Sequence, residues 1–144
     1  MTNKNIKSIC IFCGSRKGSD ILYEEVAVEL GFLIAKNNLK LVYGGGNIGL
    51  MGALASSAQK SNCDILGVIP DHLLKKEVGK TTLKNLVVTK NMHNRKKLMY
   101  ENADAFIVLP GGVGTLDEFF EIITWSQLDL HDKPIILMNI NIFS

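Results

Sequence analysis

The sequence has few of the features that mark specialised classes of protein. Its 144 residues include three cysteines, three prolines and one tryptophan, and the formal net charge is only +2. No apolar run approaches the roughly 20 residues that a membrane-spanning helix needs. Residues 1–8, MTNKNIKS, lack the long apolar segment of a signal peptide. The sequence therefore predicts a cytoplasmic protein without a membrane partner.

Neither charge nor cysteine spacing indicates a nucleic-acid or metal site. The one dense basic cluster, residues 95–97, is too short to predict a nucleic-acid face and equally fits a solvated helix surface. Cys10 and Cys13 have C-x-x-C spacing, but the segment ICIFC is typical of a strand, whose alternation places the two thiols on opposite faces. A zinc site needs a second pair, and Cys63 stands alone. We expect buried structural cysteines, no metal and no cofactor.

What is present is the composition of one ordinary globular domain spanning residues 1–144. Hydrophobic residues make up 47% and charged residues 21% of the chain. A chain of 144 residues is long enough to bury roughly 70% of its unfolded surface. Short apolar runs alternate with segments of helical periodicity, as in a parallel sheet covered on both faces. We therefore predict an α/β, Rossmann-like doubly wound sheet in three layers. The expected strands are 6–13, 39–43, 65–69, 86–89, 106–109 and 135–139.

Four helices are expected between these strands. One of about 17 residues begins near Asp20, with a buried side comprising Leu22, Val26, Leu30, Leu33 and Ile34. The next, over 48–61, is rich in small residues, as a closely packed helix would be. The others are 91–102 and the segment that follows Thr115. Residues 71–84 show no clean period and predict a mobile loop or short helix near a site.

The stretch from Ala105 to Glu121, AFIVLPGGVGTLDEFFE, has the pattern of strand, glycine turn and helix. Such a junction presents unpaired backbone N–H groups and the positive end of a helix dipole, so it predicts an anion site. Thr115 and Glu118 also fit a capping box, in which both residues serve only the helix end. The capping box and a catalytic glutamate remain alternatives here. Arg95 and Lys96 are the natural cationic partners, since a guanidinium can hold a phosphate through two parallel hydrogen bonds.

A second glycine cluster follows the second expected strand. Gly44, Gly46 and Gly49 fit G-x-G-x-x-G, and Asp64 lies at about the distance of a ribose-binding acid. The dinucleotide fingerprint belongs on a first strand, however, and its acid at the end of the next. We therefore favour a glycine turn that lets a ligand or a helix approach the backbone closely.

Four segments together resemble the LOG (Lonely Guy) family, often mislabelled as lysine decarboxylases: GGGNIGLMG, MHNRK, PGGVGTLDE and ITWSQLDLHDKP. The resemblance implies a phosphoribohydrolase that releases the free base and ribose 5-phosphate from nucleoside 5′-monophosphates. It places the catalytic arginine on Arg95 and the catalytic glutamate on Glu118. It places substrate binding on Glu77, Lys96, Gly112, Val113, Gly114, Thr115, Leu116, Asp117 and Thr124. Val113 and Asp117 stand where relatives commonly have Tyr and Glu, mild changes that leave the turn intact.

The glycine turns add Gly14, Ser15, Gly45, Gly46 and Gly111 as candidate substrate-binding residues. In the expected mechanism the turn from Gly111 to Thr115 holds the phosphate and Glu118 stabilises the positive charge that develops on the ribose. The alternative is a non-catalytic nucleotide or cofactor carrier on the same fold, which would not need both Arg95 and Glu118. The resemblance also implies a homodimer. The sequence stops soon after the sixth expected strand, so either a partner subunit covers that face or the chain is a short member of the family.

Overall fold

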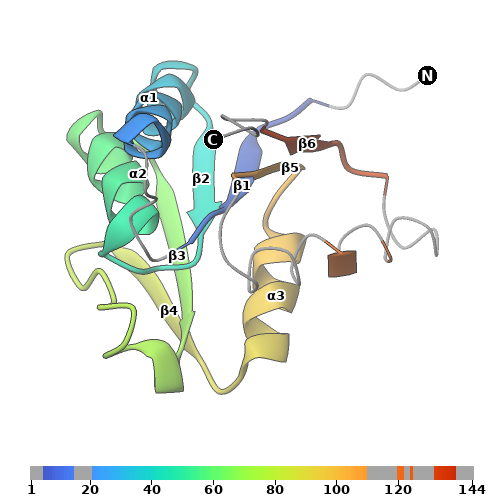
Figure 1. The fold of residues 1–144 in the computed structure, drawn as a ribbon. Coiled ribbons are helices and arrows are strands. Elements are labelled where there is room, and N and C mark those ends of the chain that lie inside the picture. Colours follow the sequence, from blue (N-terminus) through green and yellow to red (C-terminus); the bar gives the residue numbers. More distant parts are fainter. Residues whose placement is uncertain (1–4, 15–20, 110–119, 122–123, 125–131, 139–144) are drawn as a thin grey trace.

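The computed structural model in Figure 1 describes residues 5–14, 21–109, 120–121, 124 and 132–138. These residues contain a six-stranded sheet with helices on both faces, which confirms the predicted α/β three-layer fold. The strands are β1 (Ser8–Phe12), β2 (Lys40–Tyr43), β3 (Ile65–Pro70), β4 (Asn85–Thr89), β5 (Ala105–Val108) and β6 (Ile135–Leu137). The helices are α1 (Ile21–Lys36), α2 (Gly49–Lys60) and α3 (Met92–Glu101), with a 3-10 helix η1 (Asp71–Leu73).

All neighbouring strands pair in parallel, in the order β4-β3-β2-β1-β5-β6. The chain therefore moves outward from β1 to β4 and then returns to the other side of β1 with β5. Right-handed crossovers that run in opposite directions place their helices on opposite faces of a sheet. The direction reverses between β1 and β5, and such a switch point opens a crevice at the carboxyl ends of the strands.

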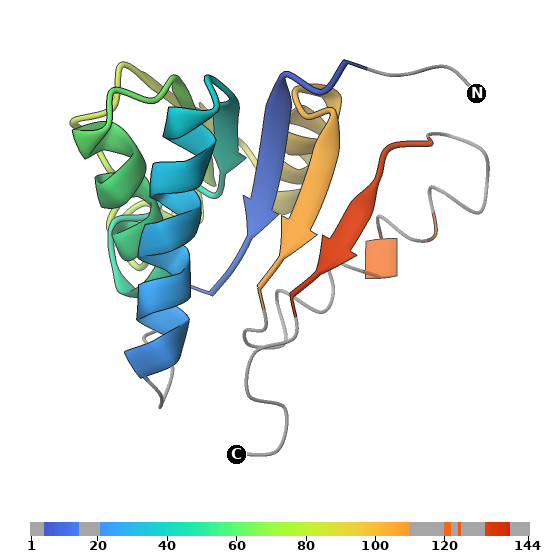
Figure 2. The ribbon, with the colours of Figure 1, turned by 90° about the horizontal axis from the view of Figure 1, so that it is seen from above.

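Two separate hydrophobic clusters lie on the two faces of the sheet. One packs β1, β2 and β5 against α1 and α2, and the other packs the opposite face against α3. Figure 2 shows α1 and α2 on one side of the sheet and α3 behind it. Cys13 belongs to the first cluster and Cys10 to the second, so the prediction of buried cysteines on opposite faces is confirmed for this pair. Cys63 is only half-buried.

The predicted inner face of α1 is partly wrong. Its buried residues are Ala27, Gly31 and Ile34, whereas Leu22 and Leu33 are each 40% exposed. The reason is that α1 packs on α2 as well as on the sheet, and this contact selects small residues. A Cβ on Gly31 would lie 2.6 Å from the Leu54 carbonyl oxygen of α2. The wide leucine side chains therefore sit at the margin of the contact.

The connection from β3 to β4 has no α-helix. After η1 the chain continues in turns over residues 74–84, in agreement with the prediction of a loop or short helix at 71–84. Of the helices in the described part of the chain, none is long and apolar enough to cross a membrane.

Candidate active site

The candidate residues gather at the carboxyl edge of the sheet. β1 runs into Gly14, β2 into Gly44 and β3 into the turns that carry Glu77. α3 begins at the same edge, after β4. Its N-cap is Asn91, whose side-chain oxygen accepts a hydrogen bond of 2.8 Å from the Asn94 amide. This cap fixes the first turn of α3 and with it the position of Arg95.

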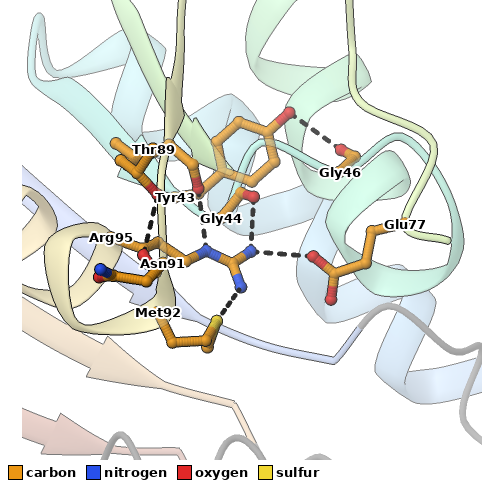
Figure 3. A network of polar contacts seen from close by, with 9 residues as sticks. Tyr43, Gly44, Gly46, Glu77, Thr89, Asn91, Met92 and Arg95 are labelled. Atoms are coloured by element: carbon orange, nitrogen blue, oxygen red, sulfur yellow. Dashed lines mark hydrogen bonds and ion pairs between the residues drawn. The ribbon is translucent and has the colours of Figure 1, made fainter. Parts of the chain in front are cut away.

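Arg95 is buried, with only 3% of its surface exposed. Its Nε donates to the Val68 carbonyl at 2.9 Å, and its Nη2 donates to the Gly44 carbonyl at 2.6 Å. The same Nη2 donates to Glu77 Oε1 at 3.0 Å in an ion pair. Nη1 contacts the Met92 sulfur at 3.7 Å. Figure 3 shows the guanidinium at the centre of this network, between the glycine turn and Glu77.

This geometry corrects the expectation that Arg95 holds a phosphate through two parallel hydrogen bonds. The edge formed by Nε and Nη2 is committed to two backbone carbonyls, and both Nη2 protons have acceptors. Of the three guanidinium nitrogens, only Nη1 has no oxygen acceptor among the described residues. Arg95 can therefore meet an anion with Nη1 and cannot offer a two-nitrogen fork in this arrangement.

The glycine turn after β2 is covered by protein. Gly46 forms an antiparallel bridge with Gly79, the Asn47 amide donates to the Glu77 carbonyl at 3.1 Å, and the Lys80 amide donates to the Gly45 carbonyl at 2.9 Å. A Cβ on Gly44 would lie 2.3 Å from Arg95 Nη2. The turn was predicted to let a ligand or a helix approach the backbone closely. The structure places side chains of two helices there, Arg95 of α3 and Met51 of α2, together with the segment 77–80.

Two further buried groups brace the turn. The Tyr43 hydroxyl donates to the Gly46 carbonyl at 3.0 Å, and burial raises the pKa of this phenol well above its usual range, so it stays neutral. Lys80 Nζ donates to Asn47 Oδ1 at 3.0 Å and to Ser56 Oγ at 3.4 Å. Burial lowers the pKa of the Lys80 amine. Neither residue could be identified from the sequence, because neither lies in a motif and their partners are distant or backbone atoms.

The remaining candidates are distributed as follows. Lys96 Nζ pairs with Glu121 Oε2 at 2.7 Å, and Thr124 Oγ1 donates to the Phe120 carbonyl at 2.9 Å. Gly14 is half-buried, and its carbonyl accepts from the Met51 amide at 3.2 Å. The other candidates lie outside the described residues: Ser15, Gly111, Gly112, Val113, Gly114, Thr115, Leu116, Asp117 and Glu118.

Neither a dinucleotide fingerprint nor a metal cluster is formed by the described residues. Asp64 immediately precedes β3, at the amino edge of the sheet, whereas the glycine turn follows β2 at the carboxyl edge. A strand of six residues spans about 20 Å, so Asp64 is too far away to bind the ribose of a dinucleotide on that turn. No group of three or more His, Cys, Asp or Glu side chains suited to a metal occurs in the described ranges.

Comparison with known sequences gives a consistent family. A family model described as "Possible lysine decarboxylase" matches residues 51–143. The chain is 46% identical over 134 residues to the cytokinin riboside 5′-monophosphate phosphoribohydrolase LOG1 of Arabidopsis thaliana, covering 93% of this chain and 63% of that protein. It is 43% identical over 141 residues to LOG3 of the same plant, covering 98% of this chain and 66% of that one. The chain thus spans less than two thirds of the length of these relatives.

Solved structures share the fold at lower sequence identity. The molybdenum cofactor carrier protein of Chlamydomonas reinhardtii superposes with a TM-score of 0.73 at 22% identity, covering 91% of this chain and 76% of that one. The molybdenum cofactor binding protein of Rippkaea orientalis gives 0.71 at 24% identity, covering 94% and 78%. These likenesses establish the fold, and the family follows from the sequence matches. The chain belongs to the LOG family, whose curated members carry the name cytokinin riboside 5′-monophosphate phosphoribohydrolase.

Proposed function

We propose that the protein hydrolyses the N-glycosidic bond of adenosine 5′-monophosphates, including those modified at N6, and releases the free base and ribose 5-phosphate. The observation that carries the proposal is Arg95. It is buried at the carboxyl edge of the sheet, and among the described residues its Nη1 alone has no oxygen acceptor. Curated relatives at 43% and 46% identity are named cytokinin riboside 5′-monophosphate phosphoribohydrolases, which supports this class of reaction.

The chemistry assigns separate tasks to the two halves of PGGVGTLDE. Backbone N–H groups from Gly111 to Thr115 and the Thr115 hydroxyl hold the phosphate. As the bond between C1′ of the ribose and the base breaks, its electrons leave with the base and positive charge develops on the ribose. The Glu118 carboxylate stabilises that charge and orients or deprotonates the water that adds to C1′.

One described contact ties the chain just after PGGVGTLDE to α3. Lys96 follows Arg95 on α3, and its ion pair with Glu121 holds residue 121 against this helix. Glu118 precedes Glu121 by only three residues in the sequence. Arg95 then contributes one nitrogen, Nη1, to positioning the substrate, while the donors on Nε and Nη2 keep the guanidinium in place.

The direct test is to incubate the purified protein with AMP and with an N6-prenylated AMP and to quantify free base and ribose 5-phosphate. We expect both products. Glu118→Gln should fold and bind nucleotide but lose at least about 100-fold in turnover, in line with the loss of a catalytic carboxylate. Near-normal turnover by this variant would leave Glu118 as part of a capping box and would contradict its catalytic role.

The second candidate is a non-catalytic carrier of a nucleotide or cofactor. It is favoured by the fold shared with proteins described as molybdenum cofactor carriers. These structures are only 22% and 24% identical to the chain, so they support the fold more strongly than a ligand. The carrier predicts nucleotide binding without product. Absence of both free base and ribose 5-phosphate, with binding retained, would replace the hydrolase by the carrier.

We also propose that the protein is a homodimer in the cytoplasm. A stripe of exposed apolar side chains on α1, formed by Ile21, Val28 and Phe32, supports a partner on this helix. None of the three cysteines, all within the described residues, forms a disulfide, which is typical of a reducing compartment.

A further inference from the structure

The Glu77 carboxylate faces the Arg95 guanidinium. The residue lies in the turns between η1 and β4, and its carboxylate is directed at Arg95 (Figure 3). The two side chains are 13% and 3% exposed, and Oε1 lies 3.0 Å from Nη2. This contact takes the second Nη2 proton, because the first is donated to the Gly44 carbonyl. Nε donates to the Val68 carbonyl. All N–H groups of the guanidinium other than those of Nη1 therefore donate to an oxygen.

The turn that carries Glu77 is held by several independent contacts. The Glu77 amide donates to the Leu73 carbonyl at 2.8 Å, and the Gly79 amide donates to the Leu74 carbonyl at 2.9 Å. The Glu77 carbonyl accepts from the Asn47 amide at 3.1 Å. These hydrogen bonds hold the backbone of Glu77 against the glycine turn that follows β2. From this position its side chain contacts Arg95.

Val78, the next residue, adopts a backbone conformation that valine rarely adopts. Its φ is +49°, and its side chain is 45% exposed, so burial of the side chain does not explain the conformation. A β-branched residue in the left-handed region costs on the order of 1–3 kcal/mol. Such strain persists only where the surroundings over-determine the backbone. The surroundings here are the bonds that join segment 77–80 to the glycine turn and to Arg95.

We propose that Glu77 is a positioning residue, which acts through Arg95 rather than on the substrate. Its carboxylate holds the guanidinium plane so that Nη1 faces the reaction site, and the strained turn at Val78 presents the carboxylate for that purpose. This inference rests on the proposed function and revises the substrate-binding role that family resemblance gives to Glu77. Because orientation needs an acceptor and not a charge, a glutamine should serve almost as well as the glutamate.

The test compares Glu77→Gln, Glu77→Ala and, as a matched control, Lys76→Ala, which removes an exposed neighbour of Glu77. With AMP as substrate, we expect Glu77→Ala to lower kcat at least about tenfold while KM changes less than about threefold. Glu77→Gln should stay within about threefold of the wild type in both constants, and Lys76→Ala should match the wild type. A rise in KM with kcat retained in Glu77→Ala would show direct substrate binding and overturn the proposal.

A second readout does not depend on turnover. NMR of the Arg95 side chain measures the exchange between Nη1 and Nη2 caused by rotation about the Nε–Cζ bond. We expect this exchange to be at least about tenfold faster in Glu77→Ala than in the wild type and nearly unchanged in Glu77→Gln. An unchanged exchange rate in a folded Glu77→Ala protein would overturn the positioning role. If the wild type gave no product, the proposed hydrolase would fail, and this measurement would still decide what Glu77 does.

Discussion

At the scale of single residues, Arg95 has both a structural and a chemical task. Its guanidinium joins the end of β2, the strand β3 and the Glu77 turn to α3. Removing the side chain would take a hydrogen-bond donor from two buried carbonyls and the counter-charge from one carboxylate, each of which is costly. Loss of activity in an Arg95 variant therefore has to be read together with its stability. Glu77 offers the cleaner experiment, because Arg95 keeps both backbone acceptors when Glu77 is replaced.

Asp104 provides a pH-dependent contribution to stability at the other end of the sheet. Its Oδ2 accepts from the Lys7 amide at 2.8 Å and from the Ser8 amide at 3.1 Å, which joins the starts of β1 and β5. The hydrogen bond from Lys7 is the main cause that lowers the pKa of Asp104 below its usual value of 3.8. Since the pKa is lower in the folded state, the contribution is complete above 3.8 and is lost as pH falls through the folded-state pKa.

We therefore predict that Asp104→Asn lowers the free energy of unfolding by about 1 kcal/mol at neutral pH, since an amide accepts these bonds less well than a carboxylate and the site is partly exposed. The difference should shrink as the carboxylate of the wild type becomes protonated. Urea unfolding at about pH 7 and about pH 3 measures both effects. Asp64→Asn, at an exposed position, is the control. A difference that stays constant over this pH range would contradict the assigned cause.

Sequence could identify the residues of this network but could not assign their partners. Arg95 and Glu77 were found through the resemblance of their segments to the family. Their mutual ion pair was not predicted, because a separation of 18 residues across a strand carries no periodic signal. Gly44 was predicted as a site of close approach. That the approaching group is the Arg95 guanidinium depends on how α3 packs across the sheet.

At the scale of secondary structure, the contact between α1 and α2 brings two helix backbones unusually close together. Gly31 of α1 rests directly on the backbone of α2, where a Cβ would be 2.6 Å from the Leu54 oxygen and 3.0 Å from the Ala58 nitrogen. The Ser57 hydroxyl donates across the same contact to the Val28 carbonyl. Two backbones this close cannot yield by rotating a side chain. The contact thus depends on the absence of one methyl group.

Gly31→Ala should accordingly destabilise the protein by about 1–3 kcal/mol through overpacking. In a helix without such a contact the same substitution would be stabilising, by about 1 kcal/mol, so the sign of the change tests the packing. Urea or thermal unfolding supplies the measurement. The control is Glu29→Ala at an exposed position of α1, expected within about 0.5 kcal/mol of the wild type. A more stable Gly31→Ala protein would refute the close approach.

Periodicity and apolar runs predicted all six strands and the helices α1 to α3 to within a few residues. The positions of the ends were helped by explicit stop signals, such as Gly44 after β2 and Pro70 at the end of β3. The inner face of α1 was predicted less well, because hydrophobicity alone favoured Leu22 and Leu33 over Gly31. The contact with α2 made residue size more important than residue hydrophobicity at this position.

At the scale of the whole molecule, the order of the strands decides where chemistry can occur. β1 lies between β2 and β5, with α1 and α2 packed on one face of the sheet and α3 on the other. Alternation of strands and helices predicted a doubly wound sheet. It did not predict this order, which depends on contacts between residues far apart in the sequence. The glycine turn, Arg95 and Glu77 all lie at this carboxyl edge, in agreement with the general position of sites in such folds.

The outer surface of α1 carries exposed apolar side chains, which are unusual on a helix that faces only solvent. Ile21, Val28 and Phe32 are 72%, 44% and 44% exposed, and their spacing of seven and four residues places them in one stripe along the helix. Lys36 Nζ lies 6.0 Å from the centre of the Phe32 ring and leaves much of that ring accessible. The buried side of α1, with Ala27, Gly31 and Ile34, is already packed on α2 and the sheet, which leaves the stripe accessible to a partner.

If the stripe is the dimer contact, Phe32→Glu should yield monomers, because burying a carboxylate without a partner costs more than the contact of one ring can offset. Light scattering coupled to size-exclusion chromatography should give twice the chain mass for the wild type and the mass of one chain for the variant. The thermal unfolding midpoint should depend on protein concentration only in the wild type. Lys60→Glu introduces the same charge at the exposed end of α2 and should stay dimeric. A dimeric Phe32→Glu protein would move the contact away from α1, and a wild type that is monomeric at all concentrations would contradict the proposed homodimer itself.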